Sequence, residues 1–156
     1  MRTSVDVHNF LLDRDVPHEV FSARGRLRSP ETIAAVLDLP PGEVGRVVVF
    51  EGPEGPLAVV VSSEAEADPL RVRNVTGQAV EPVSDDRATE LTEYLAESIP
   101  PVGLPNGFAV VVDRSLQRDD VLYFPGGEAR AVLKIRGTDL VRATEATVAP
   151  VARPAT

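Results

Sequence analysis

Hydrophobic residues in this chain gather in short continuous runs, which are separated by segments rich in proline, glycine and charged residues. Continuous apolar runs are typical of strands covered on both faces, whereas half-exposed strands alternate apolar and polar residues. The clearest runs are 46–51 (RVVVFE) and 57–62 (LAVVVS), with a turn rich in Gly and Pro at 52–56 between them. This pattern predicts a β-hairpin.

Further strands are predicted where such runs recur, and helices where a cap residue precedes apolar residues at helical spacing. We expect strands at 16–21, 78–83, 108–113, 121–124, 130–135 and 147–151. We expect helices at 5–15, at 29–37, at 84–95 and from 138 onward, while 64–75 gives no clear pattern. The order of elements predicts an α/β fold, a curved mixed β-sheet or barrel of at least six strands flanked by short helices.

The size and composition of the chain are those of one globular domain. It has 156 residues, of which 43% are hydrophobic and 26% charged, enough to bury a core. We expect the domain to span 1–150 and a loose, proline-containing tail to follow at 151–156. No apolar run reaches the roughly 18 residues that a membrane span needs, and the N-terminus has no signal-peptide core. These features predict a cytoplasmic protein with no membrane partner.

The charge of the chain restricts its partners. Its 16 basic and 24 acidic residues give a formal net charge of −8 at pH 7. Such a chain does not hold DNA or RNA through a broad basic face, so a nucleic acid must be bound locally or delivered by another protein. Cysteine is absent and His8 and His18 are the only histidines, which excludes thiol chemistry and argues against a metal cluster. We therefore expect no DNA partner, no metal and no cofactor.

One loop stands out by its stiffness. The stretch 97–107 (ESIPPVGLPNG) holds three prolines and two glycines. Loops of this kind often form the wall of a pocket, although a rigid connector between a helix and a strand would have the same composition. The chain has no GxSxG, P-loop, GxGxxG or HExxH motif, so enzyme classes with these signatures are not indicated.

Taken together, these elements resemble the YbaK family of aminoacyl-tRNA deacylases, which is related to the editing domain inserted in bacterial prolyl-tRNA synthetases. The likeness covers nearly the whole chain. It rests on the strand at 17–21, the strand start at 45–50 (GRVVVF), TEY at 92–94, the loop at 97–103, the strand at 109–113, Gly126-Gly127, the strand at 132–135 and Asp139-Leu140. The corresponding family features include a lysine at the strand start, TGY, GGxSPxG, a GG turn and a DL step. The resemblance implies a single YbaK-like domain.

The resemblance also implies where the site lies. In the family, a lysine at the position of Arg46 binds the aminoacyl ester and the terminal adenosine, and the loop backbone polarises the ester carbonyl or orders a water. The implied catalytic residues are Arg46, Ile99, Pro101 and Gly103. The implied substrate-binding residues are Arg46, Val47, Glu97, Ser98, Pro100, Gly126, Gly127 and Asp139, the last fixing the pocket wall.

Five positions in that site depart from the family pattern. Arg46 replaces the lysine, Val47 a hydroxyl residue, Glu97 and Ser98 the two glycines, and Pro100 a serine. Arginine keeps the positive charge, but its planar fork is longer than an ammonium group. Glutamate in place of glycine brings a charged side chain to where backbone would meet substrate. An ion pair between Glu97 and Arg46 would close the pocket.

Two functions follow from this resemblance. The first is a trans-acting deacylase that hydrolyses the ester of a mischarged small amino acid on tRNA, with proline-type tRNA expected. Its partners would be the 3′ end of aminoacyl-tRNA and prolyl-tRNA synthetase. The second is a catalytically impaired binding or partner-docking module, because the lysine and the loop glycines are replaced. An open pocket beside Arg46 would favour the deacylase, whereas closure of the pocket by Glu97 would favour the binding module.

Overall fold

The computed structural model describes residues 1–155, and its elements follow most of the segments that the hydrophobic pattern separates. The helices are α1 (Ser4–Asp13), α2 (Pro30–Leu37), α3 (Pro69–Thr76), α4 (Asp85–Thr92) and α5 (Gly137–Thr144). The strands are β1 (Glu19–Ser22), β2 (Gly45–Gly52), β3 (Gly55–Ser62), β4 (Ala65–Ala67), β5 (Glu81–Pro82), β6 (Ala109–Asp113), β7 (Val121–Pro125), β8 (Ala131–Arg136), β9 (Thr147–Ala149) and β10 (Ala152–Pro154). Short 3-10 turns are η1 (Pro41–Glu43), η2 (Ala96–Ser98) and η3 (Arg114–Leu116).

Side-chain caps set where several helices begin. The Thr3 hydroxyl and the Asp6 carboxylate form a reciprocal capping box at α1, with the Thr3 N–H donating to Asp6 at 2.8 Å. Ser84 caps α4 as predicted and accepts the N–H of Arg87 at 3.2 Å. Helix α4 ends at residue 92 rather than 95, because Glu93 adopts a left-handed conformation with φ of 65°.

The largest sheet has the strand order β5-β2-β3-β6-β9. The predicted hairpin forms β2 and β3, with Val48 opposite Val59, whereas β3–β6 and β6–β9 are parallel. Successive residues of β3 enter two different hydrophobic clusters, Val60 one and Val59 and Val61 the other. Both faces of the sheet are therefore covered, which explains the continuous apolar run in the sequence.

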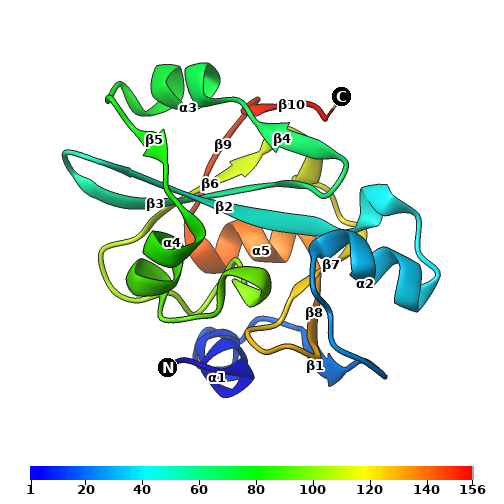
Figure 1. The fold of residues 1–156 in the computed structure, drawn as a ribbon. Helices are drawn as coiled ribbons and strands as arrows, with labels where there is room; N and C mark the ends of the chain where they lie inside the picture. The colour runs from blue at the N-terminus through cyan, green and yellow to red at the C-terminus, as the bar shows by residue number, and fades with distance from the viewer. Residues whose placement is uncertain (156) are drawn as a thin grey trace.

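A second, antiparallel sheet has the order β1-β8-β7. The largest hydrophobic cluster joins it to the first sheet and includes Leu11 of α1, Phe124 of β7, Leu133 of β8 and Leu140 of α5. In Figure 1, α3 with β4 and β10 lies on one side of the large sheet, and α1, α4 and α5 lie on the other with the second sheet. No helix among residues 1–155 is long and apolar enough to cross a membrane.

The structure corrects two sequence expectations and assigns one segment that the sequence pattern left open. The strands do not close into a barrel: they divide among sheets of five, three and two strands, and β5 and β9 are the outer strands of the largest. The open segment, 64–75, forms β4 and most of α3. Residues 152–154, expected in a loose tail, pair with β4 instead. The buried carboxylate of Asp113 holds this turn, since it accepts the N–H groups of Val151 at 2.9 Å and Ala152 at 3.1 Å.

Candidate active site

Arg46 lies at the start of β2, where the chain enters the large sheet. The preceding Gly45 touches the ring of Phe124, and a Cβ built on Gly45 would lie 2.2 Å from a ring carbon. Val44 forms a bridge with Tyr123, so the entry into β2 is fixed against β7. Within residues 1–155 the guanidinium of Arg46 forms no ion pair, and its Nε is enclosed without a hydrogen-bond partner. The backbone is thus held while the head group stays available.

Glu97 lies in η2, just after α4, and its partner is Arg26. The Arg26 Nε donates to Glu97 Oε1 at 3.0 Å, and Nη2 of the same guanidinium contacts the same oxygen. The Glu97 side chain is 24% exposed and that of Arg26 56%. The conjectured ion pair between Glu97 and Arg46 is therefore wrong. The segment between β1 and α2 brings Arg26 to Glu97, and backbone hydrogen bonds from Ala23 and Leu27 to the β7–β8 turn hold that segment.

Arg46 and Glu97 line one open pocket of about 500 Å³. Its other lining residues are Arg26, Arg28, Ser29, Pro30, Glu31, Asp85, Leu95 and Ala96. Three arginines and three carboxylates therefore face one space. The wall formed by Arg26 and residues 28–31 was not predicted from the sequence, although the alternating arginines of 24–28 (RGRLR) just before a helix start could have indicated it.

The middle of the predicted loop is buried rather than open. Ser98 is only 2% exposed; its carbonyl accepts the N–H of Gly127 at 3.0 Å, and its hydroxyl is enclosed without a partner. Ile99 belongs to the largest hydrophobic cluster and Pro100 is buried. Val47, on β2, packs against the same cluster. None of these residues lines the pocket.

The glycine pair at 126–127 is explained by contacts within the protein. A Cβ on Gly126 would lie 2.8 Å from the backbone of Ala131. Gly127 has a positive φ of 97°, and a Cβ there would lie 3.0 Å from the ring of Tyr94. Both positions require glycine because neighbouring protein atoms approach them closely. The pair packs on the loop, and neither glycine lines the pocket.

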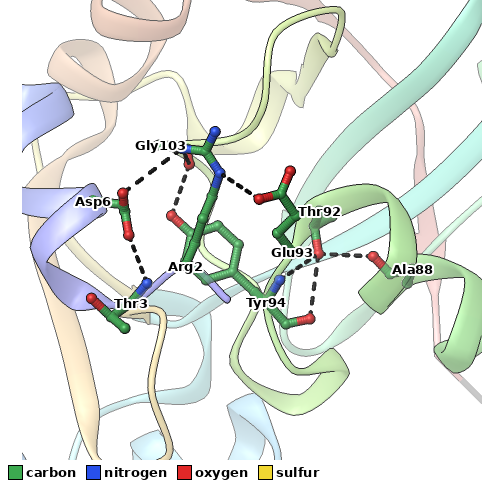
Figure 2. Close-up of polar contacts among 8 residues, drawn as sticks. All are labelled: Arg2, Thr3, Asp6, Ala88, Thr92, Glu93, Tyr94 and Gly103. Carbon is green, nitrogen blue, oxygen red and sulfur yellow. Dashed lines mark hydrogen bonds and ion pairs between the residues drawn. The ribbon is translucent and has the colours of Figure 1, made fainter.

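The end of the loop is anchored at Gly103, as Figure 2 shows. The buried Tyr94 donates its hydroxyl to the Gly103 carbonyl at 2.8 Å, and Arg2 Nη1 approaches the same oxygen at 3.4 Å. Burial, and secondarily the charge of Asp6, raises the pKa of the Tyr94 phenol above its ordinary value. The phenol therefore remains a neutral donor, and it ties the loop to the end of α4.

Three of the predicted site residues lie at other hollows. Pro101 and Gly103 line a hollow of about 200 Å³ together with Phe10 and Phe108. Asp139 lines a third hollow, of about 320 Å³, and its carboxylate pairs with Arg142 at 3.1 Å. The structure thus brings together Arg46 and Glu97 from the predicted set and places the remaining residues outside their pocket.

Helix α4, which contributes Asp85 to the pocket, is tied to β2 by an ion pair. Arg87 donates to Glu51 through Nη2 at 2.8 Å and through Nε at 3.1 Å. This two-point contact lowers the pKa of the Glu51 carboxyl from its ordinary value and raises the pKa of Arg87. It fixes the helix that carries one wall of the pocket.

The described residues bring no three of His, Cys, Asp or Glu together in an arrangement that could hold a metal ion. The two histidines contact each other instead, with His8 Nδ1 and His18 Nε2 2.8 Å apart. His18 Nδ1 also lies 2.7 Å from the Val16 carbonyl. Their contact links α1 to the start of β1, outside the arginine-lined pocket.

Comparison with known proteins agrees with this fold. Residues 25–143 match the family described as aminoacyl-tRNA editing domain. No curated protein sequence matches the chain significantly. The structure of hypothetical protein APE2540 is similar with a TM-score of 0.89 and 27% identity over 95% of this chain and 99% of that one. A protein described as "a putative trans-editing enzyme for prolyl tRNA synthetase" is similar with a TM-score of 0.87 and 21% identity, over 98% of both chains.

Proposed function

The chain belongs to the family of aminoacyl-tRNA editing domains, and on that premise we propose that it is a trans-acting deacylase. Its proposed reaction is hydrolysis of the ester between a mischarged small amino acid and the 3′ adenosine of a tRNA. The observation that carries the proposal is Arg46, which lines an open pocket and whose guanidinium has no hydrogen-bond or ion-pair partner within residues 1–155. A positive group in such a position is suited to a ligand oxygen that is negative or becomes so.

Hydrolysis of an ester needs few catalytic groups from the protein. Water attacks the ester carbonyl carbon, the carbonyl oxygen gains negative charge, and the ribose oxygen then leaves and takes up a proton. We assign Arg46 to the aminoacyl-adenosine end, where it holds the substrate and offsets the charge that develops on the carbonyl oxygen. Binding of the ester beside a held water supplies the orientation that the reaction needs. Ser98, Ile99 and Gly127 support the wall of the pocket, and Asp139 has no contact with it.

The distribution of charge supports local binding of the tRNA end. The chain is acidic overall, with a net charge of −8, and the pocket itself holds three arginines and three carboxylates, one pair of which, Arg26 and Glu97, is joined. Arg28 and Arg46 form no ion pair within residues 1–155 and suit the phosphates and hydroxyls of a single-stranded 3′ end, whereas two such groups cannot hold the body of a tRNA. We propose that a synthetase, prolyl-tRNA synthetase in the first instance, delivers the substrate. The choice of proline-type tRNA is supported by the family resemblance.

The second candidate is a binding module that has lost the reaction. One observation favours it: Ile99, Pro101 and Gly103, whose backbone was expected to polarise the carbonyl, do not line the pocket with Arg46. The open pocket and the pairing of Glu97 with Arg26 favour the enzyme.

Release of labelled amino acid from mischarged tRNA separates the two candidates. Alanyl- and cysteinyl-tRNA for proline are incubated with the intact protein, Arg46→Ala and Arg46→Lys, with and without prolyl-tRNA synthetase. The Arg136→Ala variant is the matched control, because Arg136 is exposed and lies outside the pocket. The deacylase predicts hydrolysis above the uncatalysed rate that Arg46→Ala abolishes, Arg46→Lys partly retains and Arg136→Ala leaves intact. Absence of turnover on every substrate, with synthetase present, would refute it.

A further inference from the structure

Within residues 1–155, only one oxygen of the Glu97 carboxylate accepts hydrogen bonds. Both contacts from Arg26, through Nε at 3.0 Å and through Nη2, go to Oε1. No hydrogen bond within residues 1–155 reaches Oε2, and that oxygen belongs to a side chain lining the pocket. Arg26 therefore orients the carboxylate and leaves its second oxygen available to a ligand.

The other carboxylates of the pocket are held less firmly. Glu31 and Asp85 are exposed, whereas the Glu97 side chain is 24% exposed. A carboxylate that is already oriented and partly enclosed loses less freedom when it binds a ligand. Its interaction with a cation is also less weakened by water and salt than that of an exposed group. Glu97 is thus the anionic group in the pocket best prepared to bind a positive charge.

The substrate class of the proposed function carries a positive group next to its reacting carbon. In an aminoacyl ester the α-ammonium and the carbonyl are joined through the α-carbon, and α-amino groups titrate near pH 8. The pocket offers one group for each: Arg46, whose guanidinium has no partner within residues 1–155, for the oxygen, and Glu97 Oε2 for the nitrogen. A blocked amine, as in an N-acetylaminoacyl ester, has no charge to offer and adds bulk.

We propose that Glu97 is a specificity residue: its Oε2 accepts a hydrogen bond from the α-ammonium of the substrate, and the protein therefore acts on esters with a free amine and discriminates against N-acylated ones. Arg26 is a positioning residue, which acts through Glu97. This inference rests on the proposed deacylase function.

The test compares alanyl-tRNA with N-acetylalanyl-tRNA. Because the ammonium itself makes the ester more labile, each enzymatic kcat/KM is divided by the uncatalysed rate for the same substrate. The ratio of the two normalised values is the amine preference, and a general loss of activity cancels from it. The preference is measured for the intact protein, Glu97→Gln and a control, Glu54→Gln, which alters an exposed residue in the turn between β2 and β3.

We expect the intact protein to prefer the free amine by about tenfold or more, the usual weight of a charged hydrogen bond. Glu97→Gln should reduce the preference to near unity, and Glu54→Gln should retain it. The preference should also weaken as the pH rises through the pKa of the substrate amine. Arg26→Met should reduce it in part and mainly through KM.

Three results would overturn the inference while the deacylase function stands: equal normalised rates on both esters, an amine preference that survives Glu97→Gln, or a preference lost in Asp85→Asn instead. If neither ester is hydrolysed, the proposed function fails and the inference fails with it. Circular dichroism of each variant establishes that it is folded. Because Arg26 is 56% exposed, loss of its ion pair with the partly enclosed Glu97 in Glu97→Gln should cost little stability.

Discussion

The replacement Tyr94→Phe tests how the loop that follows Glu97 is held at Gly103. It removes the hydroxyl that donates to the Gly103 carbonyl at 2.8 Å and leaves the buried ring in place. The carbonyl keeps a weaker partner, because Arg2 Nη1 lies 3.4 Å away. The loss is therefore that of one net hydrogen bond, about 1 kcal/mol, and not the larger cost of an orphaned buried carbonyl. For a chain of this length that corresponds to a fall in Tm of about 2–4 °C.

The measurement is urea unfolding followed by circular dichroism, with Tyr123→Phe as the matched control. Tyr123 is half-buried, and its hydroxyl forms no hydrogen bond within the described part of the chain. The control should stay within about 0.5 kcal/mol of the unmodified protein. The m-value should be unchanged, since the same surface is exposed on unfolding. A loss in Tyr94→Phe no larger than in the control would show that this contact does not hold the loop, and a loss above about 3 kcal/mol would show that the hydroxyl does more than make one bond.

Four further predictions concern a backbone conformation, an ion pair, a tightly packed glycine and the salt dependence of the reaction. Glu93 has a φ of 65°, so Glu93→Gly should raise the unfolding free energy by about 0.5–1 kcal/mol in urea titration. Arg87 holds the pKa of the folded Glu51 carboxyl below its unfolded value. The stabilisation from this ion pair is present at pH values above the ordinary pKa of the carboxyl and is lost as the pH falls through its lowered pKa. The unfolding free energy should therefore fall less steeply on acidification in Glu51→Gln than in the unmodified protein. Gly45→Ala would place a Cβ 2.2 Å from the Phe124 ring, so it should lower the unfolding free energy by about 2 kcal/mol or more and should also lower the rate of deacylation. An unchanged unfolding free energy and rate would contradict the tight fit. With only three arginines in the pocket, the slope of log kcat/KM against log salt should be no steeper than about −2.

The local pattern of the sequence predicted those helices and strands whose pairing or capping residues are close in the chain. The hairpin of β2 and β3 could be predicted because apolar runs and a short turn specify it, and Ser84 marked the start of α4. The loose tail was a wrong prediction, since the strand at 152–154 depends on hydrogen bonds from its start to Asp113, and nothing in the tail itself indicates them. Likewise, apolar runs show which segments become strands but not how those strands divide among sheets.

The candidate site shows the same division. The resemblance indicated Arg46 and Glu97, which do line one pocket. The partner of Glu97 could not be predicted, because Arg26 lies 71 residues away along the chain and reaches it only through the path of the segment before α2. Gly126 and Gly127 were expected to admit substrate, but the space they leave is filled by Ala131 and Tyr94. A glycine in a sequence indicates that another group lies close to the backbone, but it does not indicate whether that group belongs to the protein or to a ligand.

The central claim is that the pocket of Arg46 and Glu97 receives the aminoacyl-adenosine end of the substrate. NMR titration of the intact protein with 3′-alanylamido-3′-deoxyadenosine, in which an amide replaces the labile ester, tests it most directly. The predicted result is a saturable set of chemical-shift changes centred on residues 26–31, Arg46 and 95–97, which Arg46→Ala abolishes. Changes centred instead on the hollow beside Pro101, or on that beside Asp139, would contradict the claim.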